Sequence, residues 1–423
     1  MERKLIQLSD VITDIAAGPF GSNLKVSCFV NDGFPIIDGA NLRSFKVTDN
    51  ITKFVTEEKA RSLHRSIAKR GDIVVTISGT LGQIAYIPED SKYEEYLCSQ
   101  RQFRVTFDTT KVYVPYLAFY FHTYEGQHKI LSFANQVGVP ALSQPLKNFR
   151  RITIQLPDID TQKKIAIFVE LINEKIEQNE SINNNLEQQA VLLFKKWFIE
   201  FDNSSKNMLE TRFGLVPESF KLLKNGELPL VVTDYVANGS FASLKANVTL
   251  YQEPNYAYFI RNTDLKSGTF EVFVDEHSYN FLSKSTLHGG EIIISNVGDV
   301  GSVFLCPKLD KPMTLGNNII MLRPEQENLR YYLYIWFKWL YGQSLIQGIK
   351  GGSAQPKFNK TDFKNLPIFL PPDDLLEQFH QIVKPIFELI NENNTENQAL
   401  TRTRDTILPR LMSGELDVSD IDL

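Results

Sequence analysis

Two groups of residues in this 423-residue chain come close to the spacing of known catalytic sites. Asp49 followed by Glu57-Glu58-Lys59 has the order of a nuclease site, in which an acid precedes Glu-x-Lys. We interpret these residues instead as a charged, solvated helix face, because the polar face of a helix points to water. Pro371-Pro372 lacks the Asp or Asn before it and the aromatic residue after it with which an adenine methyltransferase grips a flipped base. Neither group predicts catalysis.

The other reactive residue types are too scattered to form a recognisable site. The sequence has no Gly-x-x-x-x-Gly-Lys-Ser/Thr loop for ATP. Its six histidines show no metal-ligand spacing, and Cys28, Cys98 and Cys306 lie far apart in the chain. The sequence therefore predicts no catalytic residue, no metal site and no cofactor bound by this chain.

The net charge of −5 is unevenly distributed along the chain. Two long segments are mildly basic: residues 1–157 hold 19 Lys and Arg against 15 Asp and Glu, and residues 204–371 hold 17 against 15. Two short segments are acidic: residues 158–203 hold 5 against 9, and residues 372–423 hold 4 against 11. The long segments can approach a polyanion without strong repulsion, although so small an excess does not identify one.

Composition and hydropathy indicate a globular protein. With 43% hydrophobic residues the chain can bury sizeable cores. It contains no run of about 18 apolar residues, and its first residues do not lead into the apolar stretch of a signal peptide. We therefore expect a cytoplasmic protein that does not contact a membrane.

The chain resembles itself after about 215 residues, which indicates an internal repeat. Residues 71–82, GDIVVTISGTLG, reappear as residues 290–301, GEIIISNVGDVG. In both copies a β-branched run precedes Gly-x-x-Gly, which predicts strand, tight turn and strand, with glycine where φ is positive or the backbone approaches closely. A phosphate cradle is the alternative, which we disfavour because no helix follows. Residues 18–25, GPFGSNLK, likewise match residues 239–245, GSFASLK.

Two long stretches have a seven-residue period, which is typical of helices packed along a coiled-coil seam. The seam residues are Ile165, Ile172, Asn179, Leu186 and Leu193, and then Phe379, Ile386, Asn393, Leu400 and Ile407. Asn179 and Asn393 fall in the middle of the seam, where a polar residue can specify helix register at some cost in stability. We predict two antiparallel helices of about 38 residues that pack against each other.

These patterns predict an α+β protein with two mixed, strand-rich domains joined by two long antiparallel helices that form a coiled-coil spacer. The first strand-rich domain spans residues 1–157, and the first helical spacer spans residues 158–203. A connector and the second strand-rich domain occupy residues 204–371. Residues 372–423 form the second helical spacer and a C-terminal tail.

This arrangement resembles the specificity subunit of type I restriction-modification systems, and the resemblance covers nearly the whole chain. Four stretches carry it: LPDIDTQ at 156–162, LEQQAVLLFKKWF at 186–198, FGLVPESF at 213–220 and, most specifically, TILPRLMSGELDV at 406–418. The chain departs from the family pattern at residues 375–378, Leu-Leu-Glu-Gln, where the family more often has Glu-Gln-Gln.

The resemblance implies two target recognition domains, each of which reads one half of an interrupted site in double-stranded DNA, and helices that set the gap. It also implies two DNA methyltransferase (M) subunits and restriction/translocase (R) subunits as partners. S-adenosylmethionine, ATP and Mg²⁺ are then expected on those partners and not on this chain. The implied function is non-catalytic DNA recognition that directs methylation and restriction.

Bases are read by side chains that form bidentate hydrogen bonds, namely Arg, Lys, Asn and Gln, with help from Ser. The predicted DNA-binding residues of the first domain are Ser22, Asn23, Lys25, Asn41, Arg43, Arg101, Gln102 and Gln144, and Asn135, Gln136 and Ser143 lie in similar loops. Those of the second domain are Lys245, Arg261, Asn262, Lys350, Ser353, Gln355 and Lys357, with Ser243, Asn317 and Asn318 in similar loops. The segment 350–357 is the strongest candidate because its glycines allow close backbone approach. Trp336 and Trp339 are expected in the core and not stacked on bases.

Two other hypotheses stay open at this point. One is a scaffold whose domains bind protein; salt-sensitive binding to duplex DNA would exclude it. The other is a DNA-modifying enzyme with an unrecognised site, for which activity of the chain alone would be evidence.

Overall fold

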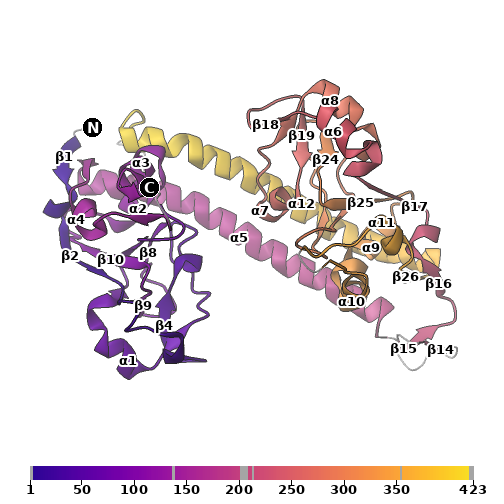
Figure 1. Cartoon of the computed structure of the whole chain (residues 1–423), viewed down its shortest axis with the longest axis horizontal. Helices are drawn as coiled ribbons and strands as arrows, with labels where there is room; N and C mark the ends of the chain where they lie inside the picture. Colours follow the sequence, from indigo (N-terminus) through magenta and orange to yellow (C-terminus); the bar gives the residue numbers. More distant parts are fainter. Residues whose placement is uncertain (1–2, 136–138, 201–207, 212–213, 353–354, 419–423) are drawn as a thin grey trace. The chain divides into compact units, whose positions relative to one another are not determined.

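The structure is a computed structural model that describes residues 3–135, 139–200, 208–211, 214–352 and 355–418 (Figure 1). Contacts between Cα atoms divide the chain into two compact units. The first unit consists of residues 1–176 and 400–423, and the second unit consists of residues 177–399. Each unit therefore combines one strand-rich domain with a part of each long helix.

The strand-rich domain of the first unit contains two larger β-sheets. The four-stranded sheet has the order β2 (Ile12–Ala17), β10 (Gln102–Phe107), β7 (Ile73–Thr76), β8 (Ile84–Tyr86). The five-stranded sheet has the order β3 (Phe29–Val30), β5 (Phe54–Val55), β4 (Phe34–Ile37), β9 (Glu95–Cys98), β6 (Ile67–Lys69), in which β4 and β9 are parallel. Two ribbons complete the domain: β1 (Arg3–Gln7) with β13 (Thr153–Pro157), and β11 (Ala134–Asn135) with β12 (Ala141–Leu142).

The second unit repeats this topology. Its four-stranded sheet has the order β17 (Leu230–Asp234), β25 (Ile319–Pro324), β22 (Ile292–Ser295), β23 (Val303–Leu305). Its five-stranded sheet has the order β18 (Leu250–Tyr251), β20 (Phe273–Val274), β19 (Ala257–Ile260), β24 (Met313–Leu315), β21 (Thr286–Leu287), and β19 and β24 are parallel. Its ribbon of β16 (Lys221–Lys224) with β26 (Pro367–Leu370) matches β1 with β13. The ribbon of β14 (Met208–Thr211) with β15 (Gly214–Pro217) precedes the repeat and does not match β11 with β12. The predicted internal repeat is therefore confirmed as a repeat of topology.

The matched sequence segments form the predicted hairpins. Strands β7 and β22 are apolar on both faces and fully buried, which is why they read as continuous β-branched runs. Each pairs antiparallel with the following strand, β8 or β23. The glycines of both turns have positive φ, at +97° for Gly79 and +78° for Gly298, so the tight turn needs glycine.

A helical hairpin packs beside each of these turns. It consists of α2 (Val114–His122) and α3 (Tyr124–Leu131) in the first unit, and of α9 (Leu329–Lys338) and α10 (Leu340–Gly348) in the second. The Gln127 amide donates hydrogen bonds to the carbonyl oxygens of Gly82 (2.9 Å) and Phe121 (2.7 Å). The Gln343 amide does the same to Gly301 (2.8 Å) and Phe337 (2.5 Å). The same side chain thus fastens the β-turn to the helices in both units.

Shorter helices cover the sheets and their edges. The α-helices are α1 (Glu57–Ser62), α4 (Pro145–Arg150), α6 (Phe241–Asn247), α7 (Asn262–Ser267), α8 (Glu276–Phe281) and α11 (Lys360–Lys364). Short 3-10 helices cover Leu8–Asp10, Val26–Cys28, Gly39–Asn41, His64–Ser66, Asn225–Glu227, Tyr235–Asn238 and Ser283–Ser285. Trp336 lies in the core of the second unit, as predicted, and is 3% exposed.

The two predicted long helices are present as α5 (Ile159–Phe198, 40 residues) and α12 (Asp373–Ser413, 41 residues), drawn in magenta and yellow in Figure 1. All ten predicted seam residues are buried or half-buried. In the first unit, Ile165 packs in one core cluster with Leu408 and Leu411. In the second unit, the Phe379 ring packs against the ring of Phe198, with centroids 4.9 Å apart. The predicted packing of the two helices along this seam is confirmed within each unit.

The asparagines of the seam pair across the two helices. The Asn179 amide donates to Asn397 Oδ1 (2.8 Å) and to Glu396 Oε2 (2.7 Å), and the Asn393 amide donates to Asn183 Oδ1 (2.8 Å). Residue 179 of α5 bonds residue 397 of α12, and residue 183 of α5 bonds residue 393 of α12. The residue numbers increase along one helix and decrease along the other, so the helices are antiparallel. Asn179 and Asn393, which match in the repeat, therefore occupy equivalent places without touching each other.

The compact units do not end where the helices begin. The boundary between the units falls after Ile176 in α5 and after Ala399 in α12. The sequence analysis assigned the helices to separate segments, 158–203 and 372–423. In the structure each half of a helix buries its apolar face in the core of one unit, so it belongs to that unit by packing.

Candidate nucleic-acid interface

Three loops come together at one end of the four-stranded sheet in the first unit: the β7–β8 turn, the β9–β10 loop and the segment before α4. The backbone N–H of Ile77 donates to the carbonyl oxygen of Arg101 (2.6 Å). The N–H of Gly79 donates to Pro140 (3.0 Å), and the N–H of Leu142 donates to Ile77 (2.8 Å). Backbone hydrogen bonds therefore hold the three loops as one rigid cluster, which is the setting in which exposed loop side chains can be preorganised.

The second unit builds the same cluster from matching segments. The N–H of Asn296 donates to the carbonyl oxygen of Asn318 (3.1 Å), and the N–H of Gly298 donates to Pro356 (2.8 Å). The N–H of Phe358 donates to the carbonyl oxygen of Asn296 (3.0 Å) and so joins the third loop to the turn. We call these two assemblies the three-loop clusters; they consist of residues 77–83, 99–101 and 140–144 in the first unit and of residues 296–302, 316–318 and 355–359 in the second.

One long polar side chain lies over the first turn glycine in each cluster. A Cβ atom placed on Gly79 would be 3.7 Å from Arg101 Nη1, and one placed on Gly298 would be 3.9 Å from Gln355 Nε2. Arg101 and Gln355 are both exposed. Arginine and glutamine are base-reading side chains with different preferences, guanine for the first and adenine for the second.

The structure brings several predicted residues of the first domain to this cluster. Gln144 is exposed and has φ of +42°, an unfavourable backbone conformation for a residue other than glycine. The loop that carries Ser22, Asn23 and Lys25 packs on the cluster. The N–H of Gly18 donates to the carbonyl oxygen of Gln102 (2.8 Å), and a Cβ atom on Gly18 would lie 1.8 Å from the carbonyl oxygen of Ser99. Arg43 is also exposed, but it lies on the loop after the 3-10 helix Gly39–Asn41.

Two predictions for the first domain are wrong, because the side chains are interior. Asn41 is 4% exposed; its amide donates to the carbonyl oxygens of Thr48 (3.2 Å) and Asn50 (3.3 Å). Its Oδ1 accepts from the N–H of Asp38 (3.1 Å), so it closes a turn. Gln102 is 2% exposed and accepts a hydrogen bond from the Ser99 hydroxyl. Both side chains serve the fold, and neither can reach DNA.

In the second unit, Gln355 and Lys357 belong to the three-loop cluster and are exposed, and Lys350 is exposed on the same segment. Lys245 is exposed on α6. Arg261 is already engaged, because its Nη2 and Nε bind the buried Asp264 carboxylate at 2.6 and 2.9 Å. Asn262 is half-buried, and its amide lies 3.5 Å from Asp299. Ser353, the remaining predicted residue, lies outside the described residues, as does Gln136 in the first domain.

The structure adds two residues that the sequence analysis did not select. Gln100 lies beside Arg101, and its Oε1 would be 2.5 Å from a Cβ atom on Gly21. Asp299 stands in the β22–β23 turn, where hydrogen bonds from Lys266 (2.5 Å) and Ser302 (2.6 Å) lower its pKa. A carboxylate can accept from the cytosine amino group. The sequence analysis chose mainly side chains that donate hydrogen bonds, so it did not select the carboxylate of Asp299. Asp299 aligns with Thr80 in the matching turn of the repeat, and this position could have drawn attention to it.

The comparison with protein families agrees with this duplicated geometry. A model described as "Type I restriction modification DNA specificity domain" matches the chain twice, at residues 21–188 and 234–402. The chain belongs to this family. It is thus a specificity subunit of a type I restriction-modification system, and its internal repeat consists of two DNA specificity domains.

Other specificity subunits align with this one over most of its length. The MjaIX specificity subunit of Methanocaldococcus jannaschii is 24% identical over 374 residues, covering 87% of this chain and 82% of the relative. The HindI specificity subunit of Haemophilus influenzae is 24% identical over 322 residues, covering 63% and 69%. The crystal structure of the S subunit from M. genitalium has a TM-score of 0.56 at 14% identity and covers 97% of this chain and 96% of that chain, which shows a shared fold.

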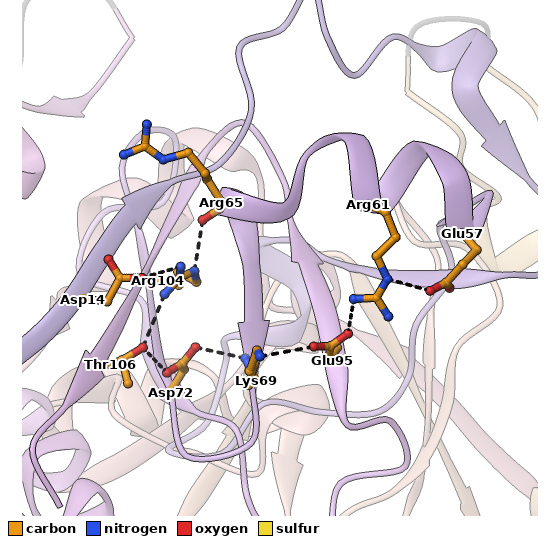
Figure 2. A network of polar contacts seen from close by, with 9 residues as sticks. All are labelled: Asp14, Glu57, Arg61, Arg65, Lys69, Asp72, Glu95, Arg104 and Thr106. Carbon is orange, nitrogen blue, oxygen red and sulfur yellow. Dashed lines mark hydrogen bonds and ion pairs between the residues drawn. The ribbon is translucent and has the colours of Figure 1, made fainter.

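In the nuclease-like group of this specificity subunit, Glu57 and Glu58 lie exposed on α1, on the solvated helix face that we expected. Glu57 binds Arg61 (2.8 Å), which also binds Glu95 (2.5 Å) (Figure 2). Asp49 accepts hydrogen bonds from the Tyr96 hydroxyl (2.5 Å) and from the Lys92 N–H (2.9 Å). The would-be acidic site is thus split between separate structural contacts.

A second part of the same network centres on Arg104, whose side chain is 11% exposed. The Arg104 guanidinium binds the Asp14 carboxylate at 2.6 Å and lowers the pKa of that carboxyl (Figure 2). Asp72, which is 3% exposed, accepts from the Thr106 hydroxyl (2.6 Å) and from the Lys69 N–H (2.9 Å), and burial raises its pKa. In the second unit Arg323, which matches Arg104 in the repeat, pairs with Glu291 (2.9 Å), which matches Asp72. The arginine is thus repeated, but its acidic partner differs between the two units.

Within the described part of the chain, His, Cys, Asp and Glu do not gather in any group of three that could hold a metal ion. The Cys98 thiol is buried, and burial raises its pKa to about 12. Over the same described residues, none of the helices is long and apolar enough to cross a membrane.

Proposed function

We propose that this specificity subunit reads an interrupted DNA site, with one half-site bound by each domain, and that it performs no chemistry itself. The recurrence of the three-loop cluster with different side chains carries this proposal. Arg101 and Gln100 occupy the first cluster, whereas Gln355, Lys357 and Asp299 occupy the second. One backbone frame with two sets of donors and acceptors suits two half-sites of different sequence.

Base contacts and phosphate contacts are divided among these residues. We assign base reading to the three-loop clusters, with Arg101 and Gln144 in the first domain and Gln355 in the second. The exposed lysines and arginines around the clusters are assigned to phosphates, which position a protein on the duplex without reading sequence. They are Lys25, Arg43, Lys245, Lys350 and Lys357.

The chemistry is assigned to partner subunits. We propose that two methyltransferase subunits bind S-adenosylmethionine and that restriction/translocase subunits bind ATP and Mg²⁺, while this chain directs them to the site. The assembly acts where the DNA is, which places it in the cytoplasm. The family assignment and the absence of a catalytic sequence motif support this division.

Domain exchange tests the proposal directly. The chain is produced with its methyltransferase subunit, and methylated positions are mapped across the host genome. Replacing residues 1–157 with the matching domain of a relative should change one half-site and leave the other intact. Arg101→Ala should reduce the binding free energy or the base specificity at one half-site only, by about 1–3 kcal/mol. Lys92 is an exposed cation of the same domain that lies outside the cluster, and Lys92→Ala should leave both half-sites unchanged.

The competing hypotheses predict other results. If both half-sites changed together after the exchange, the modular assignment would be wrong. A protein-binding scaffold would show no salt-dependent affinity for duplex DNA, whereas phosphate contacts make affinity fall steeply with salt. A hidden enzyme would methylate or cleave DNA as the purified chain alone with S-adenosylmethionine, Mg²⁺ and ATP, and we expect no turnover.

A further inference from the structure

Two phenylalanines at matching positions of the repeat project into solvent. Phe20 is 84% exposed and Phe241 is 80% exposed. They occupy the third position of the matched segments GPFGSNLK and GSFASLK. Burying a phenyl group stabilises a protein by roughly 1.5–3 kcal/mol relative to leaving it in water. Two such groups left exposed at equivalent positions indicate that each domain holds one ready for an outside contact.

The backbone that carries each phenyl group is anchored and not frayed. A leucine follows in each segment and is buried: Leu24 packs with the strands of the five-stranded sheet, and Leu244 packs in the corresponding cluster of the second unit. The N–H of Asn23 donates to the carbonyl oxygen of Phe20 (2.8 Å). The Ser240 hydroxyl caps α6, which begins at Phe241. Each phenyl group is therefore presented at a defined place.

In the first unit this place adjoins the three-loop cluster. Gly18 packs so closely on the β9–β10 loop that a Cβ atom there would lie 1.8 Å from the carbonyl oxygen of Ser99. Gly21 faces the Gln100 side chain, whose Oε1 would be 2.5 Å from a Cβ atom there. The loop of Phe20 thus leans on the loop that carries Arg101, and a duplex read by Arg101 would pass close to Phe20.

We propose that Phe20 and Phe241 are DNA-stacking side chains, which insert against or between base pairs at the edge of each half-site. This inference rests on the proposed function. Apolar wedges of this kind unstack a base step and bend the duplex, which lets the protein contact more of it. The sequence around each phenylalanine fits DNA better than a protein surface, because the exposed Lys25 lies five residues after Phe20 and the exposed Lys245 four residues after Phe241. Charged residues are depleted in the cores of protein interfaces.

Tyr124 provides a matched control. Its side chain is 86% exposed in the same unit, and it begins α3, outside the three-loop cluster. Its exposed fraction is close to the 84% of Phe20, so Tyr124→Ala also removes an aromatic ring from the surface. Removing a ring should weaken DNA binding only if that ring contacts DNA.

The test uses the chain purified with its methyltransferase subunit and a duplex that contains the site found by methylation mapping, with 2-aminopurine placed at adenines in each half-site. Phe20→Ala should weaken duplex binding about tenfold, as expected for the loss of one aromatic stack on a base. It should also change the fluorescence on binding in one half-site only, and Phe241→Ala should do so in the other. Tyr124→Ala should bind like the wild type, and all variants should unfold at the wild-type temperature because these side chains are exposed.

Three outcomes would overturn the inference. The first is unchanged affinity and unchanged fluorescence in both phenylalanine variants. The second is loss of the methyltransferase subunit on gel filtration in these variants, which would make the phenyl groups a protein contact. The third is an equal loss of binding in Tyr124→Ala. If the wild-type complex itself failed to prefer the mapped duplex, the proposed function would fail first, so the two failures are distinguishable.

Discussion

Replacement of Asn179 by leucine probes the polar layer of the helix pair. Asn179 is 1% exposed, and its amide donates to Asn397 (2.8 Å) and Glu396 (2.7 Å) on α12. A hydrogen bond to a neutral group contributes about 1 kcal/mol, and one to a charged group contributes about 1.5–3 kcal/mol. The leucine side chain regains about 1.5–3 kcal/mol by burial. We expect Asn179→Leu to lower the free energy of unfolding by about 1–2 kcal/mol, because Asn397 keeps a polar group in an apolar seam.

The double variant Asn179→Leu/Asn397→Leu should recover this loss. Replacing both partners of a buried hydrogen bond by apolar groups is close to neutral, whereas replacing one partner loses the bond and keeps the other polar group in the interface. Glu396 is exposed and can turn to water. The double variant should therefore lie within about 1 kcal/mol of the wild type, and the two substitutions should couple by about 1–2 kcal/mol in a double-mutant cycle.

The assay is denaturation by urea, followed by circular dichroism at the helix band. The repeat supplies an internal replicate, because Asn393 and Asn183 form the equivalent pair at 2.8 Å. Asn393→Leu and its double variant with Asn183→Leu should show the same pattern. Strictly additive effects at both pairs, or a single Asn179→Leu variant more stable than the wild type, would show that the asparagine layer does not hold the helices as we describe.

Three further predictions follow from the same contacts. Residues 181–184 and 392–395 face each other in the antiparallel pair, and deleting both segments removes about 6 Å from each helix. In methylation mapping this should shorten the gap between half-sites by about two base pairs and leave both half-sites unchanged. An unchanged gap in an active complex would contradict this prediction. Arg104→Met should destabilise the chain by about 1 kcal/mol at neutral pH, since solvent screens the largely exposed Asp14, and in thermal unfolding the difference should shrink as pH falls below 3.8, because the lowered pKa of Asp14 stabilises the fold only while that carboxyl is ionised. An equal difference at all pH values would assign the effect to packing. Gly18→Ala should lower both stability and DNA affinity, since its Cβ would collide with the backbone of the β9–β10 loop; wild-type behaviour in both measurements would refute that close approach.

Sequence reasoning succeeded where the signal is local or periodic. The Gly-x-x-Gly turns follow from two glycines beside β-branched runs, and the structure gives both first glycines positive φ. The seam from Ile165 to Leu193 follows from a seven-residue period, and its residues are all buried or half-buried. The internal repeat then implied that whatever the first domain does, the second does in a related way.

Sequence reasoning failed where burial decides the role of a polar side chain. Asn41 and Gln102 have the composition of base readers, yet each closes a turn in the interior. Arg261 is committed to Asp264 three residues later. The residue type determines which hydrogen bonds a side chain can form. Only the surrounding structure determines whether those bonds are already made within the protein.

The sequence by itself thus determined the hairpin turns, the two long helices and the face that each helix buries, because these depend on neighbours within one turn or one strand. It also determined the repeat, because the two copies can be compared directly in the sequence. The tertiary structure alone decided which loops meet in the three-loop clusters, since those loops lie about 20–60 residues apart in the chain and are brought together by contacts such as the backbone hydrogen bond from Gly79 to Pro140. It also decided that Asn179 pairs with Asn397 and not with its repeat equivalent Asn393, because the antiparallel packing of the two helices sets which residues face each other.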